Sequence, residues 1–201
     1  QVELHAGPDP LRRMLAEKPG NVVVLSGRNR PKIDAILASL RAGLHVLADK
    51  PWVIATDDLW KLRTALDHAR DNRLVALDVM TERHEVTSRL QRDLVNDPDL
   101  FGVIDPGSPE RPGVFVESEH YLCKTVAGVP LRRPAWFFDT SQQGEGLSDV
   151  GTHSADLVMW CLFPDSAVGI EEIEFLKAGR VPTALSRADF EQVTGERDFP
   201  D

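Results

Sequence analysis

Residues 21–79 alternate between strand-like and helix-like patterns, and this alternation restricts the fold of the chain more than any other feature. The β-branched run at 21–25 lies between two glycines and is typical of a strand buried on both faces. Further strands are predicted at 45–48 and 74–79. Strands separated by helices of this length pair in parallel through right-handed crossovers, so the sequence predicts a Rossmann-like α/β layer.

Amphipathic helices are predicted between and after these strands. The first ends at Gly43 and its buried stripe comprises Ile33, Ile36, Leu37 and Leu40. The second opens at Thr56–Asp58 and its stripe comprises Leu59, Leu62, Leu66 and Ala69. A third helix carries Val86, Leu90 and Leu94 on one face. Each helix is expected to pack one apolar face against its neighbours.

The pattern changes after residue 96. A Pro- and Gly-rich stretch follows at 97–113, and 114–138 is rich in Val, Phe, Tyr and Trp without helical spacing, which predicts antiparallel strands. One more strand is predicted at Ile170–Lys177. We therefore predict a partial Rossmann-like nucleotide-binding domain at 1–96, a connection at 97–113, and a partial α+β substrate or oligomerisation domain at 114–201.

Composition excludes several classes of function. The formal net charge of −9, with scattered Lys and Arg, argues against a nucleic-acid or anionic-membrane surface. The sequence has no apolar run long enough for a membrane span. Its two cysteines are far apart and fit reduced thiols better than a disulfide framework, so we expect cytoplasmic localisation.

Three polar segments follow the predicted strands: Ser26–Asn29, Asp49–Pro51 and Thr81–His84. Ligands of open parallel sheets bind beyond the carboxyl ends of the strands, so these segments are candidates for one binding edge. Lys50 is held extended by the following proline and can donate to a substrate oxygen or exchange a proton. The alternative is that these are ordinary polar loop residues, with Lys50 a solvated surface lysine.

A second candidate lies about a hundred residues later. Asp149 and His153 are four residues apart, so on a helix they share one face and can act as an oriented acid/base pair. They could instead be an N-terminal carboxylate and a structural histidine. With Asp156 they could also ligate a metal in a hydrolase or lyase, although no further His or Cys is suitably placed.

The segments Ala42–Pro51 and Gly144–Trp160 resemble the Gfo/Idh/MocA family of NAD(P)-dependent oxidoreductases, and the similarity extends from about residue 7 to 165. In that family a Glu-Lys-Pro motif ends a Rossmann strand, and a D-x-x-x-H pair begins a helix of the substrate domain. Asp49 stands where the family usually has Glu.

This resemblance implies hydride transfer between NAD or NADP and a secondary alcohol of a sugar, cyclitol or related polyol. The catalytic residues would be Lys50, Asp149 and His153, and no metal would be needed. The cofactor side would comprise Ser26, Gly27, Asn29, Asp49, Lys50 and Pro51. Candidate substrate contacts are Arg83, His84 and Trp136. His153 would take the hydroxyl proton, Lys50 would polarise the same oxygen, and Asp149 would orient the substrate or the histidine.

The sequence departs from the family at its ends, because it contains no G-x-G-x-x-G motif and begins at Gln1. We expect it to be the middle of a longer enzyme, to bind NAD(P) weakly by itself, and to self-associate as a homo-oligomer. The rival hypothesis is a non-catalytic family member that serves as a binding or oligomerisation module. If Lys50 and His153 form one site, their polar atoms should lie within about 8 Å of each other.

Overall fold

The computed structural model describes residues 4–199, which form two compact units. The first unit runs to Met80 and includes Thr140–Asp149. The second contains Thr81–Asp139 and the chain from Val150 onward. These units do not coincide with the domain limits at 96 and 113 suggested by the sequence, and that division stays a prediction.

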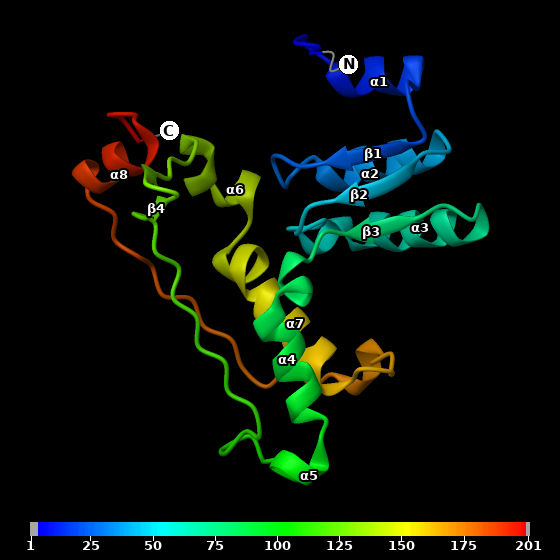
Figure 1. The fold of residues 1–201 in the computed structure, drawn as a ribbon. Helices are drawn as coiled ribbons and strands as arrows, with labels where there is room; N and C mark the ends of the chain where they lie inside the picture. The colour runs from blue at the N-terminus through cyan, green and yellow to red at the C-terminus, as the bar shows by residue number, and fades with distance from the viewer. Residues whose placement is uncertain (1–3, 200–201) are drawn as a thin grey trace. The chain divides into compact units, whose positions relative to one another are not determined.

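The first unit contains a three-stranded parallel sheet in the order β1-β2-β3 (Figure 1). Its elements are α1 (Pro10–Glu17), β1 (Val22–Leu25), α2 (Lys32–Arg41), β2 (His45–Ala48), the 3₁₀ helix η1 (Thr56–Asp58), α3 (Leu59–Asp71), β3 (Ala76–Asp78) and α6 (Thr140–Gln143). The predicted parallel α/β layer is therefore confirmed.

The core of this unit forms where α2 and α3 pack on the sheet. The entire predicted stripe of α2 is buried: Ile33, Ile36, Leu37 and Leu40. These side chains meet Val46 and Ala48 of β2, which are also fully buried. Burial of each large apolar side chain stabilises the fold by about 1.5–3 kcal/mol, so this stripe anchors the sheet edge that carries the candidate residues.

Two details of this layer differ from expectation. The prediction that β1 is buried on both faces is wrong, because Val22 and Val24 are 52% and 66% exposed while the opposite side of the strand meets the core. The predicted stripe of α3 is confirmed only in part, because Ala69 is buried and Leu62 packs against the core, whereas Leu59 and Leu66 are exposed. Ala65, which was not predicted, is also buried. Small side chains let α3 approach α2 closely, and this contact determines which face turns inward.

The second unit is less regular. Its elements are the 3₁₀ helix η2 (Thr81–His84), α4 (Val86–Val95), α5 (Pro98–Phe101), β4 (Thr125–Val126), β5 (Val129–Pro130), the 3₁₀ helix η3 (Ala135–Phe138), α7 (Thr152–Leu162), the 3₁₀ helix η5 (Ile170–Glu172) and α8 (Arg187–Thr194). The π-helical turn η4 (Leu147–Gly151) spans the limit of the two units and leads into α7. Across residues 4–199, every helix is too short or too polar to span a bilayer.

Side-chain contacts between distant segments hold this unit together. Helix α4 packs against α7, and the Arg92 guanidinium lies 4.7 Å from the centre of the Trp160 ring. A separate aromatic cluster joins Phe138, Phe190 and Phe199, with ring centres 5.4 and 4.7 Å apart. Phe190 is fully buried, so this cluster is the core around α8.

Several secondary-structure predictions for this unit are corrected. An antiparallel pair exists, but within 114–138 its strands comprise only β4 and β5, and Ala135–Phe138 is a 3₁₀ helix. The predicted strand Ile170–Lys177 is wrong, because it starts as the 3₁₀ helix η5 and continues without strand pairing. A strand requires a hydrogen-bonding partner as well as a suitable composition. Helix α4 is confirmed, although Val86 and Leu90 on its predicted inner face are exposed.

Candidate active site

The first unit brings Lys50 and Asp149 together across 99 residues of sequence. Lys50 follows the carboxyl end of β2, and its ammonium Nζ lies 3.0 Å from Asp149 Oδ1. It also donates to the backbone carbonyl of Asp149. The two side chains are only 16% and 14% exposed, so Lys50 is not the solvated surface lysine of the alternative interpretation.

The turn after β1 holds the segment that carries Asp149. The Asn29 side-chain amide donates to the Gln143 carbonyl at 2.7 Å, and the Arg30 backbone N–H donates to the Gln142 carbonyl at 3.0 Å. At Gly144 the backbone has φ 92°, and a Cβ there would stand 2.8 Å from Ile54. A glycine is therefore required where the backbone of this segment passes close to the Ile54 side chain.

Lys32 is a charged residue of this site that sequence analysis did not single out. It is 3% exposed, and its Nζ donates to Asn29 Oδ1 at 2.8 Å. Burial lowers the pKa of Lys32, while the carboxylate of Asp49 opposes this and the ammonium of Lys50 adds to it. The sequence feature that could have identified Lys32 as buried is its position one turn before Ile36, on the inner stripe of α2.

The predicted cofactor residues lie after the first two strands. Ser26 and Gly27 are exposed directly after β1, and the Asp49 backbone N–H donates to the Leu25 carbonyl at 2.9 Å. Gly27 has φ 146°, and no atom outside Gly27 and its two chain neighbours lies within 4 Å of the position a Cβ would occupy. This open, glycine-specific edge fits the close approach of a nucleotide.

Two other predicted cofactor residues are integrated into the protein itself. Both ends of the Asn29 amide are engaged, by Gln143 and Lys32. Pro51 is buried after a cis Lys50–Pro51 peptide bond. Their placement in the cofactor site stays a prediction, and the visible role of Asn29 is to join the β1 turn to the segment before Asp149.

The second unit holds His153 on α7. Its Nδ1 lies 2.9 Å from Glu82 Oε2 of η2. One residue later in η2, the Arg83 guanidinium donates to both oxygens of Asp156, with 2.7 Å from Nε to Oδ2. Arg83 therefore has an intramolecular partner as well as its predicted substrate role. His84 is exposed.

Trp136, the third predicted substrate contact, lies partly buried in η3. The hypothesis that Asp156 is a metal ligand is disfavoured, because its carboxylate is paired with the Arg83 guanidinium. Among residues 4–199 no group of three His, Cys, Asp or Glu side chains is arranged to hold a metal ion. Lys50 and Asp149 belong to the first unit and His153 to the second, so the expected 8 Å approach stays a prediction.

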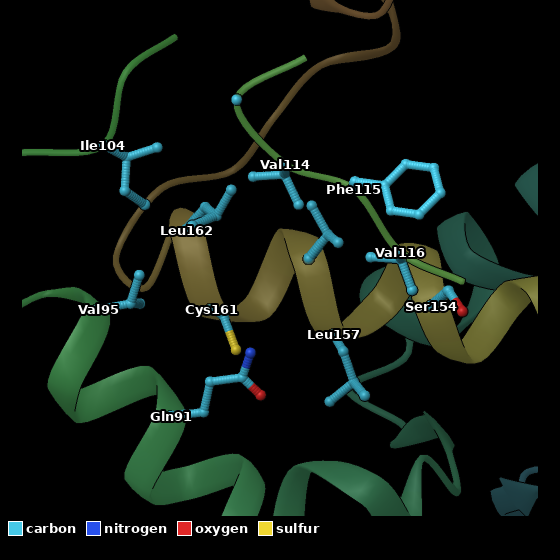
Figure 2. Close-up of a pocket in the computed structure, with 12 residues that line it drawn as sticks. Gln91, Val95, Ile104, Val114, Phe115, Val116, Ser154, Leu157, Cys161 and Leu162 are labelled. Carbon is cyan, nitrogen blue, oxygen red and sulfur yellow. The ribbon is translucent and has the colours of Figure 1, made fainter. Parts of the chain in front are cut away.

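The second unit also contains an apolar cavity of about 450 Å³ between α4, α7 and the segment at 113–116 (Figure 2). Its polar lining includes Gln91 of α4, Ser154 and Cys161 of α7. Burial raises the pKa of the Cys161 thiol, which favours the uncharged form. The lining contains no charged side chain, so this cavity does not offer the acid/base chemistry of the candidate site.

Comparison with known proteins identifies the family. Residues 90–201, more than half of the chain, match the family described as "Putative oxidoreductase C terminal domain". A comparison with curated proteins found no match. Among solved structures, the chain is 43% identical to a "putative oxidoreductase" from Parabacteroides merdae ATCC 43184, with a TM-score of 0.92. The similarity covers 98% of this chain and 45% of that one.

More distant structures share the fold. The WlbA dehydrogenase from Bordetella pertussis, solved with NADH and UDP-GlcNAcA, is 18% identical with a TM-score of 0.52, covering 76% of this chain and 40% of that one. A "putative myo-inositol dehydrogenase" from Sinorhizobium meliloti 1021 is 16% identical with a TM-score of 0.53 and the same coverage of both chains. The chain thus spans less than half the length of these three structures. The family match over more than half of the chain shows that it belongs to the oxidoreductases with this C-terminal domain, and its predicted resemblance to the Gfo/Idh/MocA-type oxidoreductases is confirmed.

Proposed function

We propose that this chain carries catalytic residues for hydride transfer between NAD or NADP and a secondary alcohol of a sugar, cyclitol or related polyol. The observation that carries the proposal is the shielded contact between Lys50 and Asp149 at 3.0 Å. An ammonium held at the carboxyl edge of a parallel sheet can donate to an alcohol oxygen bound there. The names of the two distant relatives, a nucleotide-sugar complex and an inositol dehydrogenase, support a polyol substrate.

Each residue has a distinct task in this reaction. Lys50 donates a hydrogen bond to the alcohol oxygen and stabilises the negative charge that develops on it. Asp149 orients the Lys50 ammonium through its carboxylate and its backbone carbonyl. His153 accepts the hydroxyl proton. When bound, the nicotinamide supplies the hydride acceptor.

The open edge at Ser26, Gly27 and Asp49 would hold the cofactor. Gly27 permits close backbone approach, and the Asp49 carboxylate can accept hydrogen bonds from hydroxyl groups. His84 and Trp136 remain candidates for contacts with the polyol, together with Arg83 if it can serve both Asp156 and the substrate.

The test is an assay of the protein with excess NAD⁺ or NADP⁺ and a panel of inositols, sugars and nucleotide sugars, followed by reduced nicotinamide absorbance. Lys50→Met should lower turnover of the accepted substrate by about 10²–10⁴-fold. Lys61→Met is the matched control, because Lys61 also lies in the first unit and pairs with aspartates, Asp34 at 2.7 Å and Asp58 at 3.0 Å.

Equal losses in the two variants, or unchanged turnover in Lys50→Met, would contradict the assignment. Polyol binding without any turnover would instead support the non-catalytic alternative. Calorimetry with the same panel separates these two outcomes, since it measures binding without requiring reaction.

A further inference from the structure

Two residues of η2 face two residues of α7 in a single charged cluster. Arg83 binds Asp156, and the adjacent Glu82 lies beside His153, which is one helical turn before Asp156. The Asp156 side chain is 12% exposed, so its carboxylate is largely shielded from solvent. A planar guanidinium that meets both oxygens of a carboxylate defines the orientation of both groups. The Arg83–Asp156 pair therefore positions η2 on α7.

This arrangement determines what Glu82 can contact. Both oxygens of Asp156 accept from Arg83, while Glu82 Oε2 lies 2.9 Å from His153 Nδ1. The Thr81 hydroxyl reaches the same Glu82 oxygen at 3.5 Å. The Glu82 carboxylate is thus held beside one particular nitrogen of the imidazole ring.

The environment of His153 differs at its two ring nitrogens. Nδ1 is buried, although the side chain as a whole is 25% exposed. A buried N–H without an acceptor costs about 1–3 kcal/mol, and the Glu82 carboxylate is the acceptor within reach. The carboxylate stands off the line of the Nδ1–H bond, so the imidazole or the carboxylate must rotate to complete the hydrogen bond.

We propose that Glu82 is a positioning residue that holds neutral His153 in the tautomer protonated at Nδ1. An ionised carboxylate can only accept hydrogen bonds, so it favours a proton on the nitrogen that faces it. The lone pair of Nε2 is then available to accept a proton. The catalytic meaning of this tautomer rests on the proposed function, which gives His153 the role of base, but the tautomer itself does not.

The ring nitrogens of His153 report the tautomer directly through their ¹⁵N chemical shifts, measured by NMR at a pH where the imidazole is neutral. We expect the Nδ1–H tautomer to predominate in the unmodified protein. In Glu82→Leu the acceptor is lost, and the population should shift toward Nε2–H. Glu82→Met, which also lacks a strong acceptor but is more flexible, should give the same result if the leucine variant folds poorly.

Glu85→Leu is the matched control, because Glu85 is exposed only three residues away and precedes α4. It should leave the His153 tautomer unchanged. An Nε2–H tautomer in the unmodified protein, or an unchanged tautomer in both Glu82 variants, would overturn the proposal. The measurement needs neither cofactor nor substrate, so its failure is distinguishable from a failure of polyol oxidation. If the protein oxidises a polyol, Glu82→Leu should also lower kcat at least tenfold while Glu85→Leu does not.

Discussion

The two units of this chain are organised by different kinds of interaction. In the first, consecutive strands and helices bury a continuous stripe, and hydrogen bonds join neighbouring strands over their whole length. In the second, long segments have no regular structure, and specific contacts such as Asn96 to the Cys161 carbonyl at 2.8 Å join distant parts. Periodic apolar patterns predict the first kind of structure well. The second kind depends on contacts between residues far apart in the sequence, which no local pattern predicts.

Amide hydrogen exchange should show the largest difference between the two units. The Val46 amide donates within the sheet to the Val75 carbonyl at 2.8 Å, whereas residues 114–118 lie in an exposed segment without regular structure. Exchange at Val46 should be slower by about a thousandfold or more, because it requires opening of the buried sheet. Similar protection at both places would show that the second unit is as tightly structured as the first.

Core substitutions should give the next largest difference. Ile36→Ala should lower the free energy of unfolding by about 2–5 kcal/mol, since Ile36 is fully buried in the α2 stripe. Ile173→Ala should change it by less than about 0.5 kcal/mol, because Ile173 is 58% exposed in the segment wrongly predicted as a strand. Urea unfolding monitored by circular dichroism measures both. A large cost at Ile173 would contradict the exposed placement of that segment.

Removal of the Arg83–Asp156 pair should weaken the second unit by a smaller amount. Arg83→Met leaves the shielded Asp156 carboxylate without its main donor, at a cost of about 1–2 kcal/mol after allowance for partial exposure of Arg83. Arg89→Met is the control, since Arg89 is an exposed residue of α4. Thermal unfolding of the two variants measures the difference. Equal stability would mean that the pair does not hold η2 on α7.

The smallest expected effect is the pH dependence contributed by Lys32. Burial lowers the pKa of Lys32 in the folded protein from its ordinary value of 10.5, which applies in the unfolded chain. Between the folded-state pKa and 10.5 the unfolded chain therefore binds more protons than the folded protein. Stability from this group therefore rises with pH until about 10.5. In Lys32→Met this rise should be absent, and urea unfolding across the alkaline range compares the two proteins. A parallel pH dependence in both would contradict the desolvation of Lys32.

Local sequence information was sufficient for part of this architecture. The α2 stripe and the parallel strands were predicted because each repeats an apolar pattern over consecutive turns or residues. The strand at Ile170–Lys177 was predicted wrongly because composition does not show whether a partner strand exists. The exposed face of β1 was missed for a related reason, since burial depends on which side the helices cover.

The candidate site was predictable only in part. Lys50 and Asp149 were found through their motifs, and the structure places them in contact. Lys32 was not singled out, and Glu82 was included only as part of the segment Thr81–His84, because Lys and Glu are usually exposed and only tertiary packing places them beside Asn29 and His153. Charged residues on a buried stripe are the signal that could have identified Lys32.

The most direct test of the proposal that Lys50 and His153 act on the same substrate oxygen is a double-mutant cycle on turnover of the accepted polyol. The variants are Lys50→Met, His153→Asn and their combination. If both residues serve one reacting oxygen, the double variant should lose about as much turnover as the more damaged single variant. Losses that multiply across the two single variants would contradict a shared catalytic site.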